Sequence, residues 1–178
     1  MSESIGIVQL GATLDYSIDK LRDKVALKFP NCRVRRLSPL DAPELAFDPS
    51  RNQYHSTRTI VFLEENTQPD EAEHVLGVVA FDLFVPGMNF VFGEARCPGR
   101  VAVISTYRLR TEGSKEYGLF ESRVVKEGVH EIGHMLGLKH CPNPSCVMHF
   151  SERLADTDRK KDSFCSKCEP ETRLVEIE

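Results

Sequence analysis

The sequence predicts an α/β (α+β) protein in which strand, helix, several strands and a final helix follow one another. Short apolar runs typical of buried strands recur between residues 5 and 109. Two segments, one near each end of that region, carry apolar residues every three or four positions, as amphipathic helices do. The chain has 178 residues, 40% of them apolar and 28% charged, which suits one globular domain with a real core.

Each element follows from its own pattern, in chain order. The apolar run Ile5 to Leu10 predicts a buried strand. A helix follows, because apolar residues then recur at spacings of four, three and four: Leu14, Ile18, Leu21 and Val25. Residues 32–37 predict a second strand, and three prolines between residues 37 and 54 predict a long loop. Further strands are expected at residues 58–63, 74–84, 90–95 and 101–109.

The final helix, expected from Ser122 to Leu136, has two distinct faces. Its apolar stripe is Val125, Val129, Ile132 and Leu136. Glu127, His130, Glu131 and His134 fall on the opposite side, since each residue advances about 100° around the axis. One face is therefore expected to pack on the sheet and the other to present imidazoles and carboxylates to a cleft.

The run "HEIGHMLGLKH", residues 130–140, has the spacing of a metal site. His130 and His134 are one turn apart, so their ring nitrogens can meet one Zn²⁺. A continuous helix would carry His140 about 9 Å beyond His134, too far to share the ion. Gly137 sits where the helix has to stop, because glycine enters the left-handed conformation without a Cβ penalty. The spacing therefore predicts two ligands on one turn, a reversal, and a third ligand returned to the ion.

Glu131 is predicted to be the catalytic residue of this site. Three neutral histidines leave a fourth zinc position for water, whose pKa the ion lowers to near 7. A carboxylate beside that water can take its proton and pass it to a leaving amine. Glu127 is expected to be a solvated carboxylate or one that supports the ligands. The alternative for the whole motif is a helix with surface histidines, yet three of the six His fall within these eleven residues.

A second cluster of metal-binding residues begins directly after His140. Cys141, Cys146, Cys165 and Cys168 can supply four thiolates to a closed structural zinc, which gives two Zn²⁺ per chain. Adjacent residues in an extended chain point to opposite sides, so Cys141 and His140 are expected to serve different ions. Two disulfides are the alternative. The isolated Cys32 and Cys97 are expected to be buried free thiols.

Composition and the N-terminus exclude several classes of protein. The first ten residues lack the basic region and apolar core of a secretory signal, so we expect a cytoplasmic chain in which clustered cysteines favour metal over disulfides. No apolar run approaches the roughly 20 residues that span a membrane. The net charge of −4 gives no attraction to nucleic acid or an anionic membrane, so neither is expected as a partner.

Residues 130–140 match the extended zinc motif of the metzincin metalloproteases, and the continuation "HCPNPSCVM…FCSKC" resembles the archaemetzincin family. The resemblance implies a metzincin-like zincin fold: a twisted mixed β-sheet, two main helices, an active-site cleft and a small C-terminal part. We accordingly expect an N-terminal subdomain at 1–140 with the active-site helix, and a zinc-stapled one at 141–178 with a methionine turn. It also implies that Met148 forms the floor of the site.

Two finer expectations follow from the resemblance. Metzincins commonly line the cleft with an antiparallel edge strand along which substrate adds, and residues 89–95 are the candidate here. His149 stands where several metzincins have a tyrosine that binds the developing oxyanion. We expect His149 to be a supporting or exposed histidine, with the oxyanion role as the alternative.

The predicted function is a zinc metallopeptidase acting on peptide or protein substrates. The alternative is a non-catalytic zinc-dependent protein that binds a peptide or partner without cutting it. A pure binder has no use for Glu131 between the zinc ligands, which favours the enzyme.

Overall fold

The computed structural model describes residues 3–12, 16–111 and 117–169, and its centre is a five-stranded sheet. The strand order is β2-β1-β5-β8-β7. The first four strands run parallel, and β7 is antiparallel to β8 at one edge. The strands are β1 (Ser4–Leu10), β2 (Arg33–Arg36), β5 (His74–Val79), β7 (Gly93–Ala95) and β8 (Val101–Ser105). The twisted mixed sheet is therefore confirmed.

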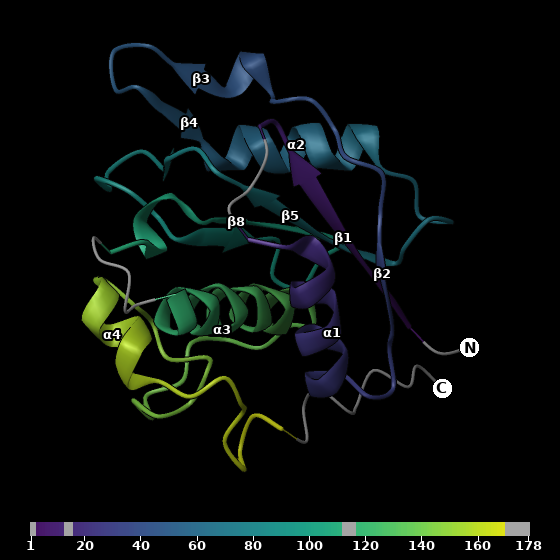
Figure 1. The fold of residues 1–178 in the computed structure, drawn as a ribbon, viewed down its shortest axis with the longest axis vertical. Helices are drawn as coiled ribbons and strands as arrows, with labels where there is room; N and C mark the ends of the chain where they lie inside the picture. The colour runs from purple at the N-terminus through teal and green to yellow at the C-terminus, as the bar shows by residue number, and fades with distance from the viewer. Residues whose placement is uncertain (1–2, 13–15, 112–116, 170–178) are drawn as a thin grey trace.

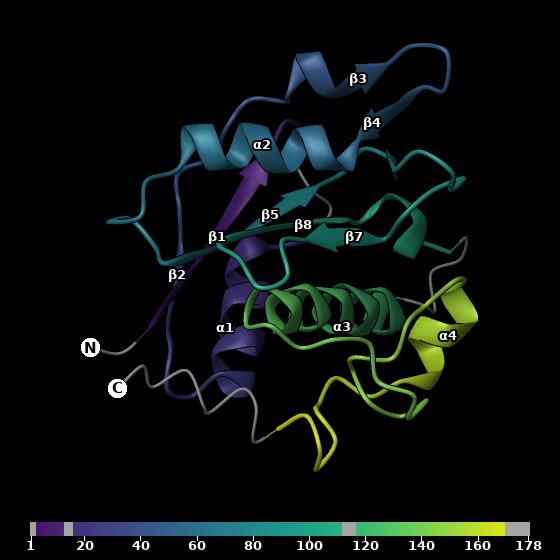
Figure 2. The same ribbon diagram turned by 180° about the vertical axis from the view of Figure 1, so that it is seen from behind.

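Helices cover both faces of this sheet (Figures 1 and 2). Helix α2 (Ser56–Asn66) lies on one face, while α1 (Ile18–Lys28) and α3 (Tyr117–Met135) lie on the other. Successive side chains of a strand point to opposite faces of the sheet, so each strand contributes residues to both helix–sheet interfaces. In β8, Val101 and Val103 pack in the cluster under α2, and Ala102 and Ile104 pack in the cluster with α1 and α3.

Smaller elements complete the described part of the chain. A second sheet joins β3 (Phe47–Asp48), β4 (Gln53–His55) and β6 (Leu83–Phe84). Short 3-10 helices span Glu44–Ala46 and Tyr107–Leu109. Helix α4 (Leu154–Arg159) follows α3 in the chain and packs beside it (Figure 1). No helix in the described ranges is long and apolar enough to cross a bilayer.

The strand predicted at residues 58–63 is wrong, because this segment forms the middle of α2. The buried residues of α2 are Ser56, Thr59, Ile60 and Leu63, a spacing of three, one and three that repeats like a helix. Two of these four residues are polar, so their helical spacing does not show in a pattern of apolar residues alone. The short apolar run by itself therefore predicts a strand. The fold thus has a third helix as long as α1.

Other predicted elements hold with shifted ends. Ile18, Leu21 and Val25 form the buried stripe of α1, whereas Leu14 lies outside the described residues. The strand expected at 74–84 is broken into β5 and β6, and those expected at 90–95 and 101–109 shorten to β7 and β8. The loop at 37–54 contains β3 and the start of β4.

Candidate metal centres

Helix α3 ends at the glycine that the sequence identified. Gly137 has a φ of +93°, in the left-handed region. The Gly137 amide donates to the His134 carbonyl, and the Leu138 amide donates to the Gly133 carbonyl. This pair of bonds is the Schellman motif, which satisfies the last carbonyls of the helix while the chain reverses. The reversal predicted between His134 and His140 is therefore present.

The three histidines come together as predicted. His130, His134 and His140 each offer a ring nitrogen, and these atoms all lie within 4.8 Å of one another. The Nε2 atoms of His130 and His134 are 3.1 Å apart. Two nitrogens bound to one tetrahedral zinc at about 2.0–2.1 Å lie roughly 3.3 Å apart. The spacing of these imidazoles therefore fits a single zinc ion.

Backbone carbonyls fix the orientation of two of these rings. His130 Nδ1 lies 2.7 Å from the Val147 carbonyl oxygen, and His134 Nδ1 lies 2.6 Å from that of Leu138. A carbonyl can only accept, so each Nδ1 carries the proton and each Nε2 keeps a lone pair that could bind a metal. Burial lowers the pKa of all three imidazoles, most strongly for His130. The rings are thus held in the neutral form that binds a metal.

Met148 is fully buried directly against α3. A Cβ placed on Gly133, between the two helical histidines, would lie 2.5 Å from the Met148 sulfur. The missing side chain at Gly133 therefore makes room for Met148 below the histidines. This position agrees with the apolar floor that the resemblance implied.

Glu131 is buried between α3 and the edge strand β7. A Cβ on Gly93 would lie 2.6 Å from Glu131 Oε1, so the carboxylate occupies the space that this glycine leaves. Burial, and then the nearby charge of Glu127, raise the pKa of Glu131 well above its usual range. Glu131, His130, His134 and His140 all line one cavity of about 350 Å³. The carboxylate therefore faces the same space as the three imidazoles.

Glu127 is not the solvated carboxylate that was one of its two predicted roles. It is 3% exposed and forms an ion pair of 3.0 Å with Lys160. The Thr157 hydroxyl donates to the same oxygen over 2.9 Å. Lys160 and Thr157 cover this part of the polar face of α3, so Glu127 is buried rather than open to solvent.

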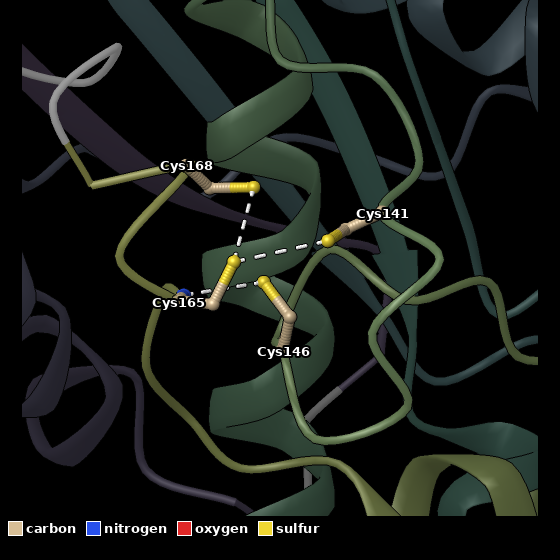
Figure 3. A group of neighbouring side chains, drawn as sticks. All are labelled: Cys141, Cys146, Cys165 and Cys168. Carbon is tan, nitrogen blue, oxygen red and sulfur yellow. Dashed lines mark hydrogen bonds between the residues drawn. The ribbon is translucent and has the colours of Figure 1, made fainter.

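The four clustered cysteines also come together (Figure 3). Cys165 Sγ lies 3.8 Å from both Cys141 Sγ and Cys168 Sγ. Sulfurs bound to one tetrahedral zinc at about 2.3 Å lie roughly 3.8 Å apart, so the thiols fit the edges of a four-thiolate site. Amides of Cys168 and Lys167 lower the pKa of Cys165 to about 6, which favours the thiolate. All six cysteines are free thiols, so the disulfide alternative has no support.

Adjacent His140 and Cys141 belong to different groups, as predicted. His149 is half-buried, with Nδ1 3.0 Å from the Cys141 carbonyl oxygen. That contact suits a supporting role. The expectation of burial is wrong for Cys97, which is exposed, and only partly right for Cys32, which is half-buried.

Sequence reasoning missed several residues of the site. Thr157 lies in a helix that no periodicity indicated and Lys160 caps the end of that helix, and nothing local marks either residue as a partner of Glu127. Part of the apolar wall of the cavity was also missed: Met88 and Phe150 lie outside residues 89–95, whereas Phe90 and Phe92 lie within that expected range. Only residues 89–95 were expected to border the cleft, and β7 does lie there as the antiparallel edge strand.

Comparison with known proteins decides the family. The family model described as peptidase family M54 matches residues 20–173. The chain belongs to peptidase family M54. It is 40% identical over 155 residues to the archaemetzincin of Methanopyrus kandleri, covering 87% of this chain and 85% of that protein. It is 45% identical over 146 residues to the archaemetzincin of Archaeoglobus fulgidus, covering 82% and 85%.

Solved structures of M54 relatives share the fold. The crystal structure of the M. kandleri archaemetzincin superposes with a TM-score of 0.86 at 36% identity, covering 96% of this chain and 93% of that one. The A. fulgidus structure, complexed with malonate, gives 0.80 at 40% identity, covering 94% and 99%. The archaemetzincin resemblance and the fold class are therefore confirmed. The protein is a zinc metalloprotease that acts on peptide or protein substrates.

Proposed function

We propose that this M54 peptidase hydrolyses peptide bonds with His130, His134 and His140 as zinc ligands and Glu131 as general base. The observation that carries the proposal is the placement of Glu131. Its carboxylate is buried one residue from His130, in the cavity that all three imidazoles line. A zinc site that served structure alone would have four protein ligands and no adjacent free carboxylate.

The residues of the chain divide the chemistry among them. Zinc, when bound, supplies the Lewis acidity that activates a water molecule and polarises the scissile carbonyl. A carboxylate oxygen of Glu131 accepts a proton as water attacks and returns a proton to the departing amine, so the two products are an acid and an amine.

The edge strand and its flanks provide a surface for the peptide. Strand β7 pairs with β8 on one side and borders the cavity on the other. An extended peptide can add to such an edge through main-chain hydrogen bonds, while Phe90, Phe92 and Phe150 offer apolar contacts. The aromatic ring of Phe150 lies 4.9 Å from that of His140, so this wall reaches the metal-binding group.

We further propose a second zinc at Cys141, Cys146, Cys165 and Cys168, which gives two ions per chain. Four thiolates leave no position for water, so this ion would stabilise a C-terminal subdomain beginning at residue 141. Free cysteines suit a reducing compartment, and we propose the cytoplasm as the place of action.

Replacing Glu131 by Gln tests the mechanism. The amide keeps the size of the side chain but cannot accept the proton, so we expect peptide cleavage to fall by at least about 100-fold while both zinc ions remain. Digestion of a peptide library, read by mass spectrometry, measures cleavage, and metal analysis measures zinc. The control is Glu121→Gln on the same helix, which loses only a surface ion pair with Lys20.

Retained cleavage in Glu131→Gln would remove this residue from the mechanism. A wild-type protein that holds peptides of unchanged mass through long incubation would instead support zinc-dependent binding without catalysis.

A further inference from the structure

Lys160 is a fully buried lysine behind the histidine group. It closes α4, and its side chain is 0% exposed. Its ammonium nitrogen lies 3.0 Å from Glu127 Oε1, 3.5 Å from His130 Nδ1 and 3.4 Å from the His149 carbonyl oxygen. One ammonium group thus touches a carboxylate, a metal-binding imidazole and the turn after Met148.

The contact with His130 is not a hydrogen bond. His130 Nδ1 donates its proton to the Val147 carbonyl, so it has no lone pair for the ammonium. A positive charge therefore lies against an imidazole that also faces a metal cation. Among the described residues, Glu127 is the carboxylate that forms an ion pair with this ammonium group, and the neighbouring cations bind other acceptors. Lys126 donates to the Thr157 and Asp158 carbonyls, and Arg123 pairs with Asp158.

Glu127 in turn depends on Lys160. It lies one helical turn before Glu131 on the same face of α3, and both carboxylates line the cavity. Thr157 supplies a hydroxyl but no charge. Without Lys160, a second buried anion would stand unpaired beside Glu131, and buried charges are tolerated only when paired.

We infer that Lys160 is a positioning residue of the histidine centre, and that it acts by charge compensation with Glu127. The pair is neutral as a whole. It keeps a second negative charge away from Glu131 and an uncompensated positive charge away from His130, and it braces the turn whose Val147 carbonyl orients His130. Its effect on turnover rests on the proposed function, but its effect on metal affinity does not.

Charge compensation predicts a result that a purely packing role for Lys160 does not. Losing either partner leaves one buried charge: Lys160→Met leaves the Glu127 anion, and Glu127→Gln leaves the Lys160 cation beside His130. Replacing both residues leaves no unpaired buried charge. A leftover cation disfavours a bound metal cation and a leftover anion does not. Glu127→Gln should therefore weaken metal binding at the histidine centre, Lys160→Met should not, and the double variant, Lys160→Met with Glu127→Gln, should return toward the wild type.

The experiment is a chelator titration of the cobalt-substituted full-length protein. Cobalt bound by the imidazoles absorbs through weak d–d bands, whereas cobalt bound by thiolates adds an intense charge-transfer band, so the two centres are followed separately. We expect Glu127→Gln to weaken the histidine centre by at least about tenfold, Lys160→Met not to weaken it, and both to leave the cysteine centre unchanged. The double variant should recover to within about threefold of the wild type, a residual loss below the roughly 10- to 100-fold that removal of a supporting residue typically causes. Lys161→Met is the matched control, because the neighbouring side chain is exposed.

Three results would overturn the inference. They are a Glu127→Gln variant that binds cobalt like the wild type, a Lys160→Met variant weakened as much as Glu127→Gln, and a double variant no better than Glu127→Gln. If Lys160→Met fails to fold, Glu127→Gln and the double variant still carry the comparison. A wild-type protein that cleaves no peptide while the affinity pattern holds would reject the proposed function and leave this inference standing.

Discussion

At the scale of single residues, two glycines leave the space that the histidine centre uses. Gly133 lies between the helical histidines and admits Met148, while Gly93 on β7 admits the Glu131 carboxylate. In a close-packed interior even one added methyl group is felt by its neighbours. Both positions therefore control where a functional side chain can lie, although neither offers a functional group of its own.

Gly93→Ala should displace Glu131. The new Cβ would stand 2.6 Å from Glu131 Oε1 and 2.8 Å from the Val103 carbonyl oxygen, and only the side chain can give way easily. A shift of about 1 Å in a reacting group can cost about 100-fold in rate, and we expect a loss of that order in kcat with zinc content unchanged. Steady-state kinetics and metal analysis measure the two quantities. Gly118→Ala, where a Cβ meets nothing within 4 Å, is the control; equal kinetics in both variants would contradict this role for Gly93.

Local spacing reveals the metal-binding residues but not the residues that support them. His130, His134 and Gly137 lie within one helix and its end, so the geometry of an α-helix relates them directly. Lys160 reaches Glu127 only after the chain has passed the three histidines and the first two clustered cysteines and has formed α4. Nothing in the sequence around Lys160 distinguishes it from its exposed neighbour Lys161, because pairing of this kind is set by tertiary packing.

At the scale of elements, the end of α3 sets the position of the third histidine. The left-handed residue Gly137 turns the chain, and the Leu138 carbonyl then accepts from His134. Cys97 Sγ also donates to this carbonyl. The segment that ends α3 therefore orients the ring of His134 and turns the chain so that His140 comes back beside it.

Gly137→Ala should weaken this end of the helix. A Cβ there would meet only Pro98, at an ordinary 3.7 Å, so the penalty comes from the backbone conformation and not from crowding. We expect the free energy of unfolding to fall by roughly 1–2 kcal/mol and zinc affinity at the histidine centre to fall with it. Denaturant unfolding and chelator competition test this. Gly137→Asn should cost less, since asparagine tolerates the left-handed region, and an Asn variant worse than Ala would argue against the conformational cause.

The helix α2 shows where sequence patterns fail for elements. Residues 58–63 end in four apolar residues and contain three that are β-branched, which favours a strand. The structure buries Ser56 and Thr59 beside Ile60, so half of the inward face is polar. By contrast, α3 keeps a strictly apolar stripe and was predicted well, because its period is visible in hydrophobicity alone.

At the scale of the whole molecule, one segment links the two metal groups. The turn from Cys141 to His149 contributes two of the clustered thiols, the Val147 carbonyl that orients His130, and Met148 beneath Gly133. Cys141, Cys146 and Cys168 also belong to the hydrophobic cluster formed by α1, α3 and the sheet. The cysteine group thus holds in place the segment that orients His130. Loss of the cysteine group should therefore lower metal affinity at the histidine group.

Cys165→Ser tests this dependence. Cys165 lies 3.8 Å from two other thiols of the group, and serine is a much poorer zinc ligand than a thiolate. We expect zinc content to fall by about one ion per chain and the segment from residue 141 onward to lose protection from hydrogen exchange, because binding free energy at such sites is folding free energy. His130 should then lose its carbonyl support, so affinity at the histidine centre falls as well. Cys32→Ser is the control, since this thiol lies outside both metal-binding groups. Unchanged zinc content in Cys165→Ser would reject the four-thiolate site, whereas loss of one ion with an unaltered histidine centre would show that the two centres are independent.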